Sequence, residues 1–188
     1  MPLKHWFCFF IAFSGGLAHA SDLSTKLARA DHVLLMRHAL APGVGDPAGY
    51  VLTDCTTQRN LNAEGLAQAQ RTGQWLRAQG VKSALVFSSP WCRCLDTAKN
   101  LDYGPVEIEP SLASFFENAQ LAHSTNTQLQ KFISQQIITK GQKALVLVTH
   151  HVNILAFMGE NVNSGDMVLA QVDAKGKMLR YTLYPSPK

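Results

Sequence analysis

The stretch His32-Val33-Leu34-Leu35-Met36-Arg37-His38 indicates both the fold and the chemistry of this chain. Its first five residues form a short, nearly continuous apolar run, which is typical of a strand buried on both faces of a sheet. Arg37 and His38 follow where such a strand ends. Because ligands of open α/β sheets bind beyond the carboxyl ends of the strands, these two side chains are candidates for a functional site.

Two further apolar runs lead into polar residues in the same way. Residues 84–87 (Ala-Leu-Val-Phe) precede Ser88-Ser89-Pro90 and, soon afterwards, Arg93. Residues 144–148 (Ala-Leu-Val-Leu-Val) precede Thr149-His150. If all three runs are strands of one parallel sheet, the polar residues after them share one crevice.

Segments with helical periodicity separate these strands and predict the fold class. Alternating strands and helices indicate a single domain, an α/β protein with a three-layer α/β/α sandwich and a mostly parallel central sheet. A terminal hairpin would add antiparallel pairing at one edge. The expected helices run from the Asn62 cap to Gly80, from the Ser89 cap with Pro90 first in the helix to about Leu101, and over 124–140 and 152–158; the remaining strands are 106–108, 167–172 and 178–183.

The Arg and His residues of the expected crevice suit a phosphoryl group. Guanidinium groups form paired hydrogen bonds to phosphate oxygens, and the helix that starts near Ser89 adds backbone donors and positive potential. A neutral imidazole is a competent nucleophile, and neighbouring Arg side chains disfavour its protonation. We therefore expect His38 to accept a phosphoryl group while Arg37, Arg93 and His150 stabilise the charge.

Four blocks of the sequence carry a family resemblance. They are Leu35-Met36-Arg37-His38, residues 59–69 (Arg-Asn-Leu-Asn-Ala-Glu-Gly-Leu-Ala-Gln-Ala), residues 88–98 (Ser-Ser-Pro-Trp-Cys-Arg-Cys-Leu-Asp-Thr-Ala) and residues 148–154 (Val-Thr-His-His-Val-Asn-Ile). In this order the blocks resemble the histidine phosphatase superfamily, also called phosphoglycerate mutase-like, over residues 32–158. Ala39 stands where the family usually has Gly. The resemblance implies the phosphoglycerate mutase-like fold, a nucleophilic His38, phosphate ligation by Arg37, Arg93 and His150, and no metal or cofactor.

The proton donor departs from the family pattern. Ser114 stands where the family often has a Glu, so Glu117 is the first candidate for this role. Asp46 and Asp54, on the loop after His38, are alternative donors or substrate ligands. A secreted bacterial branch of the family resembles this chain in that loop.

Three further residues are candidates for substrate binding, each with a structural alternative. Arg59 contacts phosphate or braces the long loop at residues 39–57. His151 supports the site or only starts a helix. Asn153 orients the site or caps that helix.

The first twenty residues read as a signal peptide. Lys4 precedes the apolar stretch 6–17, which is too short to span a bilayer, and Ala18-His19-Ala20 offers small residues at a cleavage site. A retained membrane anchor is the alternative, weakened by Ser14-Gly15-Gly16. The expectation is therefore a single domain at 21–188, secreted into the periplasm, without stable membrane insertion.

Charge and cysteine usage fit this expectation. The chain of 188 residues carries a net charge of +4, and residues 21–188 carry +3, too little to indicate nucleic acid. A small phosphorylated substrate remains the expected partner, and nothing in the sequence specifies an oligomeric state. An oxidising compartment would allow Cys55 to pair with Cys92 or with Cys94.

The predicted function is a metal-independent phosphatase of the histidine acid type, which hydrolyses a phosphomonoester through a phosphohistidine on His38. Alternatives with the same residues are a phosphohistidine-protein phosphatase, a phosphomutase and a catalytically silent binder of phosphorylated glycans or lipids. A zinc hydrolase that uses His38, His150 and His151 lacks a convincing carboxylate ligand and a suitable histidine spacing.

Overall fold

The three apolar runs pair as parallel strands in the computed structural model, which describes residues 22–188. They form β1 (His32–Arg37), β2 (Ala84–Ser88) and β4 (Ala144–Thr149), and β4 lies between the other two. The register pairs Arg37 with Thr149 and Ser88 with Val148. The carboxyl ends of all three strands therefore meet at the same edge of the sheet.

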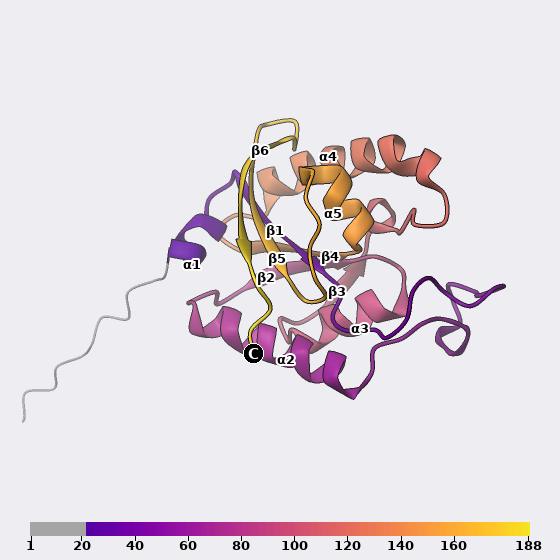
Figure 1. The fold of residues 1–188 in the computed structure, drawn as a ribbon. Helices are drawn as coiled ribbons and strands as arrows, with labels where there is room; N and C mark the ends of the chain where they lie inside the picture. Colours follow the sequence, from indigo (N-terminus) through magenta and orange to yellow (C-terminus); the bar gives the residue numbers. More distant parts are fainter. Residues whose placement is uncertain (1–21) are drawn as a thin grey trace, which may run out of the picture.

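The complete sheet has six strands in the order β3-β2-β4-β1-β5-β6 (Figure 1). The short strand β3 (Val106–Ile108) pairs parallel to β2. β5 (Met167–Val172) runs antiparallel to β1, and β6 (Met178–Tyr184) completes the expected hairpin. The prediction of a mostly parallel sheet with an antiparallel hairpin at one edge is confirmed.

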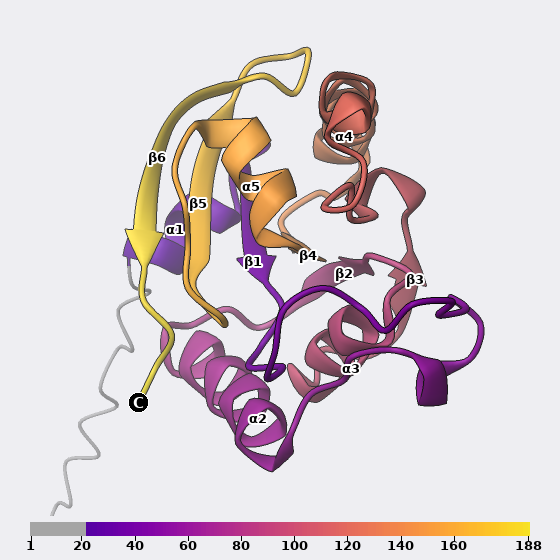
Figure 2. The same cartoon turned by 45° about the vertical axis from the view of Figure 1, so that its right-hand side comes forward.

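Helices cover both faces of the sheet (Figure 2). Strand residues alternate between two apolar clusters: Leu34 and Met36 face one cluster, whereas Val33 and Leu35 face the other. This alternation explains why the strands read as continuous apolar runs. The first cluster packs against α1 (Asp22–Leu27), α2 (Ala63–Ala78) and α3 (Cys92–Asn100), and the second against α4 (Ala122–Thr139) and α5 (His151–Met158).

Close backbone approach fixes α2 beside the loop that follows β1. Asn62 caps α2 as predicted, since its side chain accepts a hydrogen bond from the Gly65 amide at 2.8 Å. A Cβ atom on Gly65 would lie 2.0 Å from the Leu40 carbonyl oxygen. Only glycine allows the chain just after His38 to pack this tightly on the helix.

Two local predictions were wrong or incomplete. The third helix does not start at Pro90: it begins at Cys92 with Trp91 as N-cap and no side-chain cap, because the Ser89 hydroxyl contacts His150 instead. The six-residue helix α1 was not expected; Leu23 and Leu27 hold it on the core.

The N-terminal prediction falls on residues that the structure leaves undescribed. The signal peptide at residues 1–20 lies outside residues 22–188. Within the described part, no helix combines the length and apolar character needed to cross a bilayer.

Candidate active site

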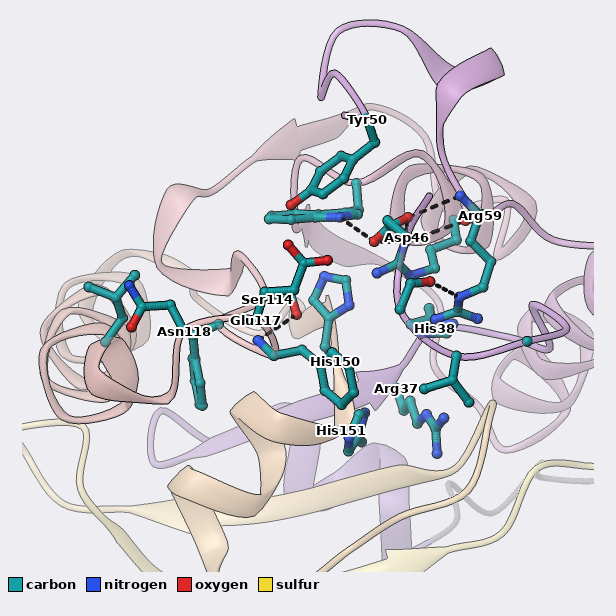
Figure 3. Close-up of a pocket in the computed structure, with 18 residues that line it drawn as sticks. Arg37, His38, Asp46, Tyr50, Arg59, Ser114, Glu117, Asn118, His150 and His151 are labelled. Atoms are coloured by element: carbon teal, nitrogen blue, oxygen red, sulfur yellow. Dashed lines mark hydrogen bonds and ion pairs between the residues drawn. The ribbon is translucent and has the colours of Figure 1, made fainter. Parts of the chain in front are cut away.

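A cavity of about 460 Å³ opens at the carboxyl ends of β1 and β4 (Figure 3). Two segments cover it: the loop at residues 39–62, which includes the short 3-10 helix η1 (Cys55–Thr57), and the segment at residues 109–121, which includes η2 (Pro110–Leu112) and η3 (Ala119–Leu121). We call these segments the cover. The cavity lining includes eight predicted site residues: Arg37, His38, Asp46, Arg59, Arg93, Glu117, His150 and His151.

His38 is buried and presents one ring nitrogen that has no hydrogen-bond partner within residues 22–188. Its Nδ1 lies 2.7 Å from the Ala39 carbonyl oxygen, which accepts only if Nδ1 carries the proton, so the Nε2 lone pair remains free. Burial, together with the charges of Arg93 and Arg37, lowers the pKa of His38 to about 3, although the bond to Ala39 acts in the opposite direction. The imidazole is therefore neutral at physiological pH, as a nucleophile must be.

His150 follows β4 directly and packs against His38, with ring centroids 5.5 Å apart in an edge-on arrangement. Its Nε2 lies 2.8 Å from the Ser89 hydroxyl. Burial lowers the pKa of His150 well below its usual value, and the proximity of His38 adds to this. In the neutral ring, a hydroxyl that donates to Nε2 leaves the proton on Nδ1, where it can serve a ligand as a donor.

Arg93 lies on the first turn of α3 and is held by Asp46 from the cover. Its Nη1 donates to both carboxylate oxygens, at 2.8 and 3.1 Å. Asp46 also accepts from the Trp91 indole Nε1 at 3.1 Å and from the Arg59 amide at 3.0 Å. Within residues 22–188, the Arg93 Nε is buried and finds no hydrogen-bond partner. Asp46 thus fixes the guanidinium through one nitrogen and leaves the others available for an anion.

Asp46 is poorly suited to donate a proton. Burial acts to raise its pKa, but the hydrogen bonds from Arg93 and from the Arg59 amide outweigh burial and hold the pKa below its ordinary value. The carboxyl group is therefore ionised at neutral pH. This pairing makes Asp46 better suited to orient Arg93 than to donate a proton.

Two further guanidinium groups line the cavity. Arg37 donates from Nη1 to the Val162 carbonyl at 2.7 Å, and its buried Nε has no partner in the described residues. Arg59 donates from Nε to the Gly45 carbonyl at 2.7 Å and from Nη1 to the Ala41 carbonyl. Burial lowers the pKa of both side chains. Arginine nevertheless keeps its charge at neutral pH in proteins. Of the two roles considered for Arg59, the structure shows the loop brace, at a place where the side chain also reaches the cavity.

Glu117 and His151 lie on the opposite side of the cavity from Arg59. Glu117 reaches into it from the segment after β3, toward Tyr50 (Figure 3). His151 begins α5, and its ring stacks at a tilt on Phe116 with centroids 5.6 Å apart. Burial lowers the pKa of His151, as do the charges of the neighbouring Arg residues.

Two predicted substrate ligands do not line the cavity. Asp54 is exposed, and its carboxylate caps η1 by accepting from the Thr56 amide at 3.0 Å. Asn153 is buried under the cover and donates to the Ala113 carbonyl at 2.9 Å. Asn153 therefore does not cap α5; it fastens the segment that carries Glu117.

Sequence reasoning missed most of the apolar lining. These residues lie in irregular segments without hydrophobic periodicity, so the sequence does not predict where their side chains point. For Trp91 alone, the preceding strand indicates a place near the site. Ser89, considered only as a helix cap, contacts His150 instead. The missed lining residues include Val44, Tyr50, Trp91, Phe115, Phe116 and Leu121.

A disulfide joins the cover to α3. Of the two pairings left open, the structure has Cys55–Cys92, with a Cα–Cα distance of 5.7 Å. Cys94 is a buried free thiol, 3.5 Å from the His150 Nε2. Burial raises the pKa of Cys94 to about 12, so this thiol is protonated and unreactive.

The arrangement has the chemistry of an anion site with a built-in nucleophile. The guanidinium groups of Arg37, Arg59 and Arg93 and the imidazoles of His150 and His151 line the cavity together with the neutral imidazole of His38. A tetrahedral dianion matches this set of cations and hydrogen-bond donors. In residues 22–188, no group of three or more His, Cys, Asp or Glu side chains is arranged to hold a metal ion. Fold and site thus define an α/β protein with an oxyanion pocket.

Sequence comparison finds similarity to one family. Residues 33–120 match the model of the histidine phosphatase superfamily (branch 1). This match covers somewhat less than half of the chain. No curated protein matches the chain significantly.

Solved structures share the fold at low sequence identity. A mycobacterial glucosyl-3-phosphoglycerate phosphatase complexed with VO3 has a TM-score of 0.60 at 13% identity, covering 84% of this chain and 100% of its own. A phosphoserine phosphatase from Entamoeba histolytica gives 0.55 at 14%, with 74% and 89% covered. The protein histidine phosphatase SixA complexed with tungstate gives 0.50 at 17%, with 81% and 94% covered.

Proposed function

We propose that this protein is a metal-independent phosphatase that hydrolyses a phosphomonoester through a phosphohistidine on His38. The observation that carries the proposal is the free Nε2 of a buried, neutral His38 in a cavity that three guanidinium groups also line. Nucleophilic catalysis requires an uncharged imidazole, and phosphoryl transfer requires fixed positive charge around the moving group.

The reaction has two steps. In the first, Nε2 of His38 attacks phosphorus, the bond from phosphorus to the ester oxygen breaks, and the leaving oxygen takes a proton from Glu117. In the second, water attacks the phosphohistidine, gives a proton back to Glu117 and releases phosphate from Nε2. Glu117 has this role because it is the carboxyl group of the cavity without an ion pair in the described residues; Asp46 is occupied by Arg93.

Charge on the transferring group is met by Arg37, Arg93 and His150. The unpartnered Nε atoms of the two Arg residues fit such a ligand, since a buried guanidinium N–H without an acceptor is costly. The related structures are named for phosphoserine, for glucosyl-3-phosphoglycerate and for protein histidine. These names have removal of a phosphoryl group in common and differ in the group that leaves.

The test is His38→Ala on a generic aryl phosphate. We expect kcat/KM to fall by at least about 10³-fold, since the covalent route is lost. His123→Ala is the matched control, because His123 is exposed at the start of α4, outside the cavity. Acid-labile, base-stable radiolabel should appear on the wild-type chain after a quench, and it should be absent from His38→Ala.

Other outcomes would reject parts of this proposal. Full activity of His38→Ala would exclude the nucleophile. A rate abolished by a chelator and restored by zinc would favour metal-assisted hydrolysis. Glu117→Gln should slow esters with poor leaving groups more than esters with good ones, and an equal effect on both would remove Glu117 as the donor.

We also propose that the domain acts outside the cytoplasm, in the periplasm. The Cys55–Cys92 disulfide supports this, since such bonds persist in oxidising compartments, and so does the signal-like sequence 1–20. Cell fractionation after expression of the full chain, with the N-terminus of the exported form read by mass spectrometry, tests it. An unprocessed cytosolic protein would contradict the proposal.

A further inference from the structure

The cavity has two chemically different ends. Arg37, His38 and His150 lie at the sheet edge and Arg93 lies on the first turn of α3; we call these four residues the phosphate end. Arg59 reaches the lining from the cover. The lining also contains aromatic and aliphatic side chains from the cover and from the turn after β2, among them Trp91, which packs on His150 with ring centroids 5.3 Å apart. We call these side chains the apolar mouth: Val44, Tyr50, Trp91, Phe115, Phe116 and Leu121.

Two ring contacts build the walls of the apolar mouth. Tyr50 packs on Trp91 with ring centroids 6.1 Å apart, and Figure 3 shows Tyr50 above Glu117. Phe116 packs on His151 with ring centroids 5.6 Å apart. Three apolar side chains of the mouth remain open to solvent: Val44 is 87% exposed, Leu121 47% and Phe116 46%. Apolar surface gathered at the rim of a pocket is a common feature of a binding site.

The charged residues of the lining restrict the kind of leaving group further. Two of the three guanidinium groups of the lining, Arg37 and Arg93, belong to the phosphate end, whereas Arg59 of the cover already donates to the Gly45 and Ala41 carbonyls. Glu117 is the acidic residue of the lining without an ion pair in the described residues. A leaving group with a carboxylate or a second phosphate would therefore meet this carboxylate, and the nearby guanidinium of Arg59 is engaged by two carbonyls. An uncharged, apolar leaving group would instead cover Phe116 and Leu121 and gain the free energy of their burial.

We propose that the substrate of this site is the phosphate monoester of an apolar alcohol, with the alkyl or aryl group seated in the apolar mouth. This inference rests on the proposed function and names its substrate class. The volume of about 460 Å³ is typical of small-molecule pockets and holds a phosphoryl group together with a short alkyl chain or one aromatic ring.

A series of n-alkyl phosphates from ethyl to octyl tests the proposal, because the acidity of the leaving alcohol hardly changes along it. We expect kcat/KM to rise by up to about fourfold per methylene until the mouth is filled. Propyl phosphate should exceed glycerol 3-phosphate, which has the same carbon skeleton with two added hydroxyl groups. A flat series, or a preference for glycerol 3-phosphate, would overturn the inference while leaving the phosphatase proposal intact.

A binding measurement separates this inference from catalysis. Calorimetry with n-alkylphosphonates, which cannot be hydrolysed, should show Kd falling with chain length. If no ester turns over and phosphonates still show this dependence, the phosphatase proposal fails and the assignment of the mouth survives. If phosphonates bind equally well at every length, the mouth assignment fails.

Variants of the apolar mouth test whether the dependence of Kd on chain length arises there. Phe116→Ser and Leu121→Ser should each flatten the dependence of Kd on chain length, and their exposed positions make misfolding an improbable cause of any change. Leu179→Ser is the matched control: Leu179 is 59% exposed on β6, outside the cavity lining, and the variant should keep the wild-type dependence. A dependence unaltered in both mouth variants would overturn the proposal.

The same chemistry could come from a soluble ester or from a phosphate in a lipid surface. Octyl phosphate below its micelle concentration represents the first source, and dodecyl phosphate held in phosphatidylcholine vesicles represents the second. Faster turnover of the soluble ester would assign a dissolved substrate, and faster turnover on vesicles would assign a lipid. Turnover of neither, with active hydrolysis of glycerol 3-phosphate, would contradict the proposal.

Discussion

The phosphate end and the cover of this site are held in place in different ways. Arg37, His38 and His150 stand at strand ends, where ladder and backbone hydrogen bonds fix them; the His38 amide, for example, donates to the Thr149 carbonyl at 2.9 Å. The cover lies outside the strands of the sheet; a backbone bond from the Glu109 amide to the Ser88 carbonyl ties it to β2, and side chains supply further contacts. These side-chain contacts include the Asp46–Arg93 ion pair, the Cys55–Cys92 disulfide and the bond from Asn153 to Ala113.

This difference separates chemistry from selectivity. A group held by a sheet is positioned whatever the loops do, which suits a reacting atom that tolerates little displacement. A segment held by a few side chains can change its lining without disturbing the sheet, which suits a surface that recognises the leaving group. The two regions meet at Arg93, since Asp46 of the cover orients a cation of the phosphate end.

The largest effect is expected from Arg93→Lys, which tests that meeting point. One guanidinium serves Asp46 through Nη1 and keeps other N–H groups for the ligand, whereas an ammonium group cannot serve both in the same geometry. We expect kcat/KM for an aryl phosphate to fall by about 10²- to 10³-fold. Arg77→Lys is the control, because Arg77 binds the Leu101 and Asp102 carbonyls away from the cavity. Wild-type kinetics in Arg93→Lys would show that Arg93 does not contact the phosphoryl group.

The disulfide should be next in size. Replacing Cys55 and Cys92 by Ser removes a crosslink between residues 37 positions apart, and the chain-entropy estimate gives a loss of about 4 kcal/mol in the free energy of unfolding. Urea denaturation measures this loss in the free energy of unfolding, and wild-type protein with its disulfide reduced serves as the comparison sample. Vanadate inhibition should change by less than about threefold, a margin below 1 kcal/mol, since the sheet fixes most of the phosphate end. A larger loss of vanadate affinity than of stability would show that the two regions are not separable.

The sequence predicted these regions unequally. Arg37, His38 and His150 could be brought together from the sequence because each follows an apolar run, and parallel strands place such residues at one edge. The layers followed from the same runs. Helix α1 escaped prediction, because six residues show little periodicity and the helix depends on the packing of Leu23 and Leu27.

In the cover, composition did not determine position. Asp46 and Asp54 share one loop and looked equivalent, yet Asp46 pairs with Arg93 and Asp54 caps a surface turn. Asn153 donates to a backbone carbonyl of the cover and does not line the cavity. Such outcomes depend on long-range contacts that a local pattern does not encode. The partner of Cys55 was likewise open, because Cys92 and Cys94 are only two positions apart. The residue at which α3 starts decides which of the two faces the loop that carries Cys55.

A smaller effect is expected from Asp46→Asn. The amide keeps one acceptor for Trp91 or Arg93 but loses the charge that pairs with a buried guanidinium. We expect a loss of about 2 kcal/mol in the free energy of unfolding, below the usual cost of removing a buried partner completely. We also expect kcat/KM to fall by about tenfold, since Arg93 is less well oriented. Asp54→Asn is the matched control on the same loop, and equal effects in the two variants would exclude a special role for Asp46.

The smallest effect is a slope in the pH dependence of stability, and it separates the two regions by pH window. The folded-state pKa of His38 is about 3, whereas its ordinary value is 6.5, so between these values the unfolded chain binds a proton that the folded chain does not. The free energy of unfolding therefore decreases as pH falls below 6.5, by up to about 1.4 kcal/mol per pH unit for this group. The lowered pKa of Asp46 has a different window: its contribution is present above the ordinary value of 3.8 and is lost only below it.

Urea denaturation between pH 4.5 and 6.5 thus isolates the phosphate end from the ion pair of the cover. In His38→Gln, the free energy of unfolding should depend less steeply on pH than in the wild type, by the equivalent of about one bound proton, because glutamine does not titrate. Leu179→Ser changes no titrating group and should keep the wild-type slope, whereas Asp46→Asn should depart from it mainly below pH 4. An unchanged slope in His38→Gln would mean that His38 is protonated in the folded protein near neutral pH. The free lone pair on which the nucleophile depends would then be lost.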